Sequence, residues 1–391
     1  MEVNLGEIPF DLDFNPSNPL LAVALINGEL HLYRYQADSQ PQRVLQVSAH
    51  DEFCRAVRFV DSGRVVLTSS PDRSILATDV ETGSAISRFE EAHKDSINRL
   101  VVLTETTIAT GDDGGCIKVW DTRHHSCCNS FDAHQDYVSD MTFLSSTKQL
   151  FATSGDGSLS MCCLRENKVE ARSNISKDEL LSLVTMKDGK KVVCGTQNGP
   201  LLLYTCRRFM DCRDIFRAHP MSADALLKVD EDNLISGSKD GVIRLARILP
   251  ITTTTTLKPL SHYSGVGYLD PLSPLRLLRN IIIQPLAKHS KYVERLGFSS
   301  EKKFLGSISH DQMLKLWDFE ELLKVAQDKF NIWLAAAAAD SDDSDDMDME
   351  SVKLPPFLSF SQAPDSSRKK ERRGRAPNSS TANFFGRPVA E

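Results

Sequence analysis

Patterned cysteines and long apolar runs are the features that this sequence most clearly lacks. Its nine cysteines are an odd number scattered over 391 residues, and no two form a CxxC pair. A disulfide framework and a zinc site are therefore not expected, and we expect reduced, buried thiols in an intracellular protein. No window approaches 18 consecutive apolar residues, so neither a membrane-spanning helix nor a membrane partner is expected. The first residues show no signal-peptide pattern.

Sequence motifs of catalysis are lacking as well. The chain contains no Gly-rich phosphate-binding loop, no HExxH and no GxSxG. We therefore expect a protein without enzymatic activity, without a cofactor and without a bound metal. The composition, with 41% hydrophobic and 25% charged residues, is typical of a soluble globular protein.

The sequence does contain an internal repeat with a period of 42 residues. Five short alternating segments carry a marker residue at this spacing: Thr78, Trp120, Cys162, Tyr204 and Ala246. Tyr33 precedes the first marker by 45 residues and Trp317 follows the last by 71, which makes seven units. Turn-forming residues lie six positions before the markers: Asn27, Asp72, Gly114, Asp156, Asn198, Asp240 and Asp311. Glycine follows in five units, and Asn-Gly or Asp-Gly between alternating apolar runs predicts a β-hairpin.

Histidine, hydroxyl and acidic residues recur in step with the markers. The histidines lie upstream of the hairpins: His50, His93, His134, His219 and His289. A hydroxyl residue lies eight positions before several markers: Ser70, Ser154, Thr196, Ser238 and Ser309. Together with Asp72, Asp156, Asp240, Asp311 and aromatic markers such as Trp317, these residues predict buried His–Ser–Asp–Trp hydrogen-bond chains. Because an active site would occur once, their recurrence indicates a structural role.

Seven such units predict one all-β domain over residues 1–330, a seven-bladed β-propeller of four-stranded antiparallel blades. The pattern resembles WD repeats, whose period is about 40–45 residues. A closed ring of blades leaves only short, protected strand edges, and we expect it to be monomeric.

Two segments of the predicted ring each allow two interpretations. Residues 251–279 account for the 29 residues by which the last step exceeds 42, and they contain five consecutive threonines and three prolines. They are either an inserted surface loop or a gene-model artefact. The first unit starts near Ile8, which leaves little preceding chain for the outermost strand of blade seven. Residues 320–327 are either that strand or a helix.

Beyond the propeller we expect a disordered tail, residues 331–391, with too little apolar surface to fold. An acidic run at 340–350 precedes a basic run at 368–375. Six of those eight basic-run residues are Lys or Arg: Arg368, Lys369, Lys370, Arg372, Arg373 and Arg375. The basic run is a nuclear-localisation signal, an RNA-phosphate contact or simply a solvated charge run.

One arginine does not recur. Arg123 follows Trp120-Asp121 in unit three, whereas Glu320 occupies the equivalent place after the Trp-Asp of unit seven. The segment resembles the box by which many propellers dock onto the large damaged-DNA-binding adaptor of cullin-RING ubiquitin ligases. The resemblance assigns five residues to that box: Ile117, Val119, Trp120, Asp121 and Arg123. It implies that Asp121 orients the arginine while Trp120 packs inside the blade. The alternative is a solvated arginine with no partner.

Longer segments resemble one particular family of WD-repeat proteins. The plant-type WD-repeat protein 55 family is similar to this sequence in four segments: RAVRFVDSGRVVLTSSPDRSILATDVETG, LTETTIATGDDGGCIKVWDTR, VVCGTQNGPLLLY and EKKFLGSISHDQMLKLWD. The family implies a nuclear and nucleolar protein, which is also expected in the cytoplasm. It also implies ribosomal RNA production and ribosome assembly in animals, and reproductive development with ligase-adaptor binding in plants.

Two functional hypotheses follow. The first is a protein-interaction scaffold that serves as substrate receptor of a cullin-RING ligase. The alternative is a ribosome-biogenesis factor, acting in pre-rRNA processing without a ligase role, whose tail contacts RNA or a preribosomal protein.

Overall fold

The computed structural model describes residues 1–37, 39–124, 126–248, 281–326 and 328. Within them the chain forms seven four-stranded antiparallel sheets. The prediction of an all-β, seven-bladed β-propeller is thereby confirmed. The segment at 251–279, the tail at 331–391, and the acidic and basic runs within that tail lie outside the described residues.

Six blades are built from strands that follow one another along the chain. Blade one comprises β2 (Pro9–Phe14), β3 (Leu20–Leu25), β4 (Glu29–Gln36) and β5 (Ser39–Ser48). Blade two comprises β6 (Ala56–Val60), β7 (Val65–Ser69), β8 (Ile75–Asp79) and β9 (Ala85–Phe89), with a 3₁₀ turn at Asp61–Gly63. Blade three comprises β10 (Ile97–Thr104), β11 (Thr107–Asp112), β12 (Cys116–Asp121) and β13 (Ser126–Asp132).

The remaining blades keep the same order until the last one. Blade four comprises β14 (Val138–Leu144), β15 (Gln149–Ser154), β16 (Leu159–Cys163) and β17 (Lys168–Arg172). Blade five comprises β18 (Leu180–Met186), β19 (Lys191–Thr196), β20 (Pro200–Thr205) and β21 (Asp214–Arg217). Blade six comprises β22 (Ala223–Lys228), β23 (Asn233–Ser238), β24 (Val242–Ile248) and β25 (Ile281–Lys288). Blade seven comprises β26 (Val293–Phe298), β27 (Phe304–Ser309), β28 (Met313–Asp318) and β1 (Glu2–Asn4).

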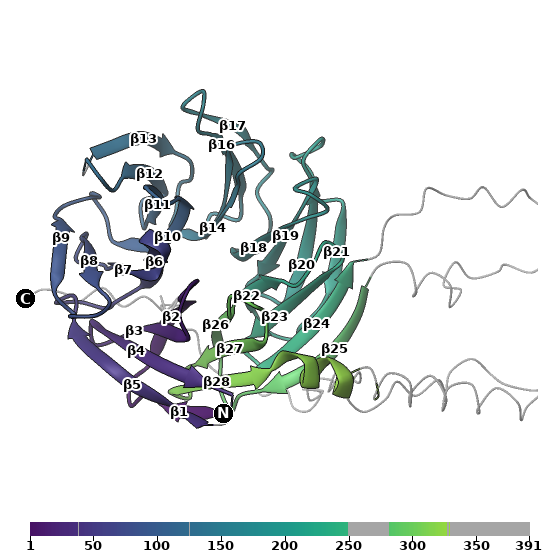
Figure 1. Ribbon diagram of the computed structural model, residues 1–391. Coiled ribbons are helices and arrows are strands. Elements are labelled where there is room, and N and C mark those ends of the chain that lie inside the picture. The colour runs from purple at the N-terminus through teal and green to yellow at the C-terminus, as the bar shows by residue number, and fades with distance from the viewer. Residues whose placement is uncertain (38, 125, 249–280, 327, 329–391) are drawn as a thin grey trace, which may run out of the picture. The chain divides into compact units, whose positions relative to one another are not determined.

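The blades close into a ring through their first strands. Each of β2, β6, β10, β14, β18 and β22 contacts the first strand of the next blade, and β26 returns to β2 (Figure 1). Seven clusters of buried apolar side chains fill the seven junctions between neighbouring blades. The hydrophobic core is therefore a set of interfaces, and no blade buries its apolar faces without both neighbours.

The N-terminal residues supply the outermost strand of blade seven. Strand β1 pairs antiparallel with β28, with Glu2 opposite Lys315 and Asn4 opposite Met313. The terminal amine of Met1 donates to the Leu316 carbonyl at 2.8 Å, and the Leu5 amide donates to the Gln312 carbonyl at the same distance. The closure of blade seven, which the sequence left open, is therefore made by the few residues before Ile8, because three residues suffice for the strand.

Residues 319–326 form a helix, so the helical alternative is correct for the described part of 320–327. Asp318 acts at its start, since its Oδ1 accepts a hydrogen bond from the Glu321 amide at 3.1 Å. An aspartate that caps free amides, followed by acidic residues in the first turn, is typical of a helix N-terminus.

The predicted glycine hairpins are present, and sterics demand glycine at two of them. Gly28 and Gly199 have φ of 81° and 101°, in the left-handed region that side-chain-bearing residues rarely adopt. A Cβ at either position would lie 2.2 Å from the carbonyl oxygen of His50 or His219, respectively. These turns therefore lie directly against the loops that carry the repeat histidines.

We expect Val3→Pro to destabilise the ring, because proline removes a backbone donor from the strand that closes blade seven. The loss is expected to be on the order of 1–3 kcal/mol in urea unfolding. Glu2→Ala is the matched control, since the half-exposed Glu2–Lys315 ion pair contributes at most about 1 kcal/mol. Equal unfolding midpoints for Val3→Pro and wild type would contradict the closure by β1.

Candidate functional site

A buried hydrogen-bond network occupies blade three beneath its hairpin turn. His93 Nδ1 lies 2.7 Å from Asp112 Oδ2, and its Nε2 lies 2.7 Å from Thr110 Oγ1. Trp120 Nε1 donates to the same hydroxyl at 2.8 Å. Since all four residues are buried, the chain gives each polar group a partner and joins three strands or turns of the blade.

The same geometry recurs around the ring. In blade seven, His289 lies 3.1 Å from Asp311 and 2.7 Å from Ser307 Oγ, to which Trp317 Nε1 donates. In blade two, His50 lies 2.8 Å from Asp72 and 2.9 Å from Thr68. Recurrence at equivalent positions of successive blades indicates that the network stabilises the fold.

Blades four and six vary the network. His134 contacts Ser158 and Ser160 at 2.9 and 2.8 Å, with Asp156 at 3.4 Å. His219 contacts Ser236 at 2.7 Å, and Arg244 lies between it and Asp240. Burial and this arginine lower the pKa of His219. The imidazole of His219 is therefore neutral at physiological pH and accepts a hydrogen bond from Arg244.

The hydroxyls that bond to the histidines are not the ones predicted eight positions before the markers. Four of the bonding hydroxyls lie ten positions before: Thr68, Thr110, Ser236 and Ser307. The predicted serines instead hold the following turn, as where Ser70 Oγ accepts from the Asp72 amide at 3.2 Å. Both positions lie on one face of the same strand, so alternation alone does not separate them.

Asp112 is a network residue that the repeat alignment missed. The aligned position in unit three is Gly114, which has no carboxylate, and Asp112 from the end of β11 takes its place. Its other oxygen accepts from the Cys116 amide at 2.8 Å. The paired aspartates of GDDGG were the available signal.

Hydrogen bonds shift the pKa of one network carboxylate, that of Asp72. Burial works to raise the pKa of Asp72, but hydrogen bonds from His50 and Ser74 outweigh it and lower the pKa to about 2. A folded-state pKa below the unfolded value means that this carboxylate stabilises the fold above its ordinary pKa, and that the stabilisation is lost in acid.

One set of described residues has ligand atoms close enough to hold a metal. These atoms of His93, Asp112 and Cys116 all lie within 4.8 Å of one another. However, both ring nitrogens of His93 already have hydrogen-bond partners, and burial raises the pKa of the Cys116 thiol. A metal needs the deprotonated thiolate and a free imidazole nitrogen, so these residues fit the hydrogen-bond network better.

Charged side chains bridge the innermost strands. Arg295 of blade seven donates to Asp140 of blade four at 3.0 Å and lies 3.6 Å from Asp11 of blade one. Asp11 also pairs with Arg58 at 2.5 Å. Arg295 is 7% exposed and Asp11 is 1% exposed, so this level of the ring centre is filled by protein.

Arg123 is exposed and held from one side. Its backbone amide and Nε donate to Asp121 Oδ1 at 2.9 and 3.2 Å, and its Nη2 donates to Oδ2 at 2.8 Å. These bonds hold the pKa of Asp121 far below its usual range. The arginine side chain is 61% exposed. Two of its five N–H donors are used, and three remain available.

The other four residues of the predicted box support this arrangement. Ile117, Val119 and Trp120 are buried in blade three. The turn after Asp121 is fixed by Thr122, whose amide and hydroxyl both donate to the Thr106 carbonyl, at 3.0 and 3.2 Å. In an antiparallel meander this turn lies on the face opposite the histidine loops.

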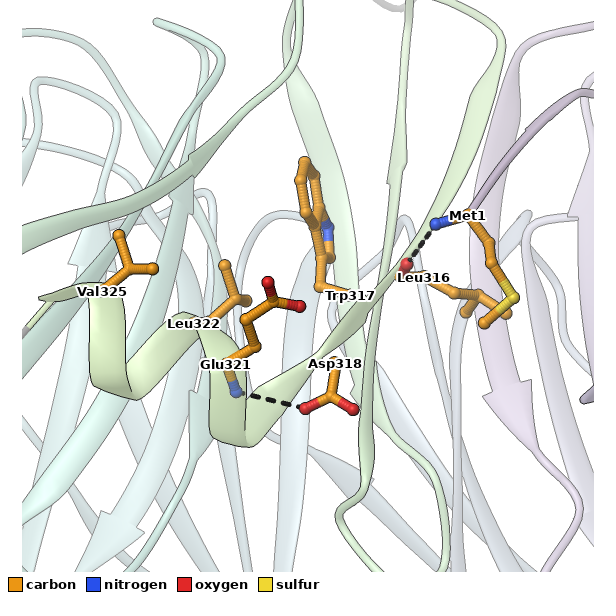
Figure 2. A pocket seen from close by; sticks show the side chains of 7 residues that line it. All are labelled: Met1, Leu316, Trp317, Asp318, Glu321, Leu322 and Val325. Atoms are coloured by element: carbon orange, nitrogen blue, oxygen red, sulfur yellow. Dashed lines mark hydrogen bonds between the residues drawn. The ribbon is translucent and has the colours of Figure 1, made fainter. Parts of the chain in front are cut away.

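The second Trp-Asp pair has a different role. In blade seven, Asp318 caps the helix at 319–326 (Figure 2). Glu320 lies within that helix. Between the helix and Trp317 lies a pocket of about 310 Å³, and Met1 and Val325 are among the residues that line it. Among the described residues, blade three alone therefore combines Trp-Asp with an arginine.

The described helices are all too short or too polar to cross a membrane. The six cationic residues of the predicted nuclear-localisation run lie outside the described part of the chain, and their role stays a prediction.

Comparison with known proteins places the chain among WD-repeat proteins. A family model described as WDR55 matches residues 1–262. WD repeat-containing protein 55 of Arabidopsis thaliana is 51% identical over 325 residues, covering 83% of this chain and 84% of the relative. Human WD repeat-containing protein 55 is 32% identical over 82% of this chain and 76% of the relative. WD repeat-containing protein JIP5 of Coprinopsis cinerea is 30% identical over 81% of this chain and 73% of the relative.

We expect His93→Ala to destabilise the protein by about 2–4 kcal/mol, because it removes one hydrogen-bond partner each from the buried Asp112 and Thr110. Thermal or urea unfolding measures the change. His124→Ala is the matched control, since that histidine side chain is 70% exposed and should matter by less than about 0.5 kcal/mol. The network has no structural role if the two variants unfold alike.

Proposed function

The chain belongs to the WDR55 family of WD-repeat proteins, and we propose that it is a non-enzymatic interaction scaffold that docks onto the large damaged-DNA-binding adaptor of a cullin-RING ubiquitin ligase. A WD-repeat propeller is in general a platform for protein partners. In this proposal the chain is a substrate receptor. The observation that carries it is the exposed guanidinium of Arg123, which is fixed by Asp121 at the edge of blade three.

Preorganisation is the physical basis of the proposed dock. An arginine loses rotamer freedom when it is captured, and this cost lowers affinity. Asp121 has already ordered Arg123 through two side-chain bonds, so a partner meets a fixed group. The three remaining donors suit a carboxylate or a pair of carbonyl oxygens on the adaptor.

The two faces of the ring give the proposed receptor two separate surfaces. Arg123 lies after a third strand, on one face, whereas the repeat histidines enter the first strands on the other. A substrate bound on the histidine side would be held apart from the adaptor. The apolar junctions would keep the two surfaces in fixed relation.

A ribosome-biogenesis role is the second candidate. The observation that favours it is the basic run at 368–375, which has the composition of a nuclear import signal or an RNA-phosphate contact. In this proposal the protein acts in the nucleus and nucleolus on pre-rRNA processing. Depletion should then change the pre-rRNA profile, and Arg123→Ala should restore it as well as wild type does. Unchanged precursors after depletion would exclude the role.

We expect Arg123→Ala to lose adaptor binding by tenfold or more, because it removes the proposed anchor. Pull-down of the purified adaptor by the intact chain, followed by titration, measures the loss. Arg64→Ala is a matched control on the same face: Arg64 is exposed and bonds to Asp61 three residues away at 2.7 Å. If both variants bind the adaptor as wild type does, Arg123 is not the dock.

A further inference from the structure

A cluster of arginines lies at the outer edge of blade five, two blades from Arg123. The connection between β20 and β21, together with β21 itself, carries four of them: Arg207, Arg208, Arg213 and Arg217. All four are exposed. Asp211 and Asp214 lie among them, so residues 206–217 carry four positive and two negative charges, a net charge of +2.

These arginine side chains make no polar contact with the described part of the chain. Elsewhere in the ring, Arg58 pairs with Asp11 and Arg244 pairs with Asp240. Within the described part of the chain, none of the four has a side-chain hydrogen bond or an ion pair. Asp211 is itself engaged, because it accepts from Asn174 Nδ2 at 2.8 Å. As far as the described residues go, the guanidinium groups are thus available to an acceptor.

Exposed apolar side chains accompany the arginines. Ile175, Met210 and Ile215 are 73%, 55% and 67% exposed. Ile175 is brought to the cluster because the preceding Asn174 amide donates to the Met210 carbonyl at 2.8 Å. On β21, Ile215 and Arg217 share the exposed side, since the Phe216 between them is buried in the junction with blade six.

The connection is anchored, which makes this a fixed surface. Phe209 is 5% exposed and packs on Phe151 in the junction between blades four and five, with ring centroids 6.1 Å apart. The Cys206 thiol donates to the Gly189 carbonyl at 2.9 Å. Binding therefore costs little loop ordering.

We propose that this blade-five patch, formed by the four arginines with Ile175, Met210 and Ile215, binds an acidic peptide segment of a protein partner that carries aliphatic side chains between its carboxylates. Arginine binds carboxylates through paired hydrogen bonds, and the aliphatic side chains match the three exposed apolar residues. The patch presents no exposed aromatic ring on which a base could stack, so single-stranded RNA is the poorer match.

Fluorescence anisotropy with the full-length protein tests the proposal. The probe is a labelled peptide of alternating Glu and Leu, and a second peptide replaces every leucine with serine. We expect the Glu/Leu peptide to bind more tightly than the Glu/Ser peptide, and its affinity to fall with added salt. The double variant Arg207→Ser, Arg208→Ser should reduce its affinity about tenfold, and Ile215→Ser several-fold. Arg123→Ala should leave it unchanged.

The alternatives give distinct results. The substituted residues are exposed, and thermal unfolding checks that each variant is folded. Equal binding of the two peptides would overturn the apolar part of the proposal. An oligouridine that binds in place of the peptide, with the same variants weakening it, would make the patch an RNA surface. Self-association lost in the same variants, measured by sedimentation, would assign it to a second copy. Absence of peptide binding would overturn the proposal outright, whatever Arg123→Ala does to adaptor binding.

Discussion

The pairing of β1 with β28 is the constraint on which the rest of the structure depends. Three residues from the start of the chain complete the last blade, so one blade is built from both ends of the propeller. Without them β28 would be an open edge, and an open edge invites pairing with other chains. The apolar junctions, the ion pairs at the ring centre and both proposed binding surfaces are fixed in relation to one another only in the closed ring.

Polar residues hold this ring together from the inside, which explains why its histidines and aspartates do not indicate catalysis. His93 and His289 each bond to an aspartate and a hydroxyl, and a tryptophan donates to that hydroxyl. Arg295 of blade seven pairs with Asp140 of blade four across the ring and lies 3.6 Å from Asp11 of the neighbouring blade one. These buried groups find their partners within the protein, except that Arg295 Nε has no hydrogen bond among the described residues. The proposed interaction sites are arginines with unused donors at the periphery.

Much of the architecture could be predicted from the sequence, because the 42-residue period sets blade number and glycine marks the hairpins. What periodicity could not resolve was local. The bonding hydroxyl lies two residues from the predicted one, on the same strand face, and Asp112 replaces a missing carboxylate from an unaligned position. A three-residue closing strand is too short to leave a pattern. The blade-five patch could not be predicted because its charges are ordinary in sequence. What sets it apart is that its arginines have no side-chain hydrogen bond or ion pair with the described residues.

Hydrogen exchange followed by mass spectrometry tests the closed ring most directly. Under conditions in which exchange reports opening equilibria, amides of β1 and β28 should exchange in the same cooperative unit as the central strands of other blades, such as β11 and β15. Exchange of β1 and β28 that is orders of magnitude faster than that of those strands would show that blade seven opens alone, and would contradict the account.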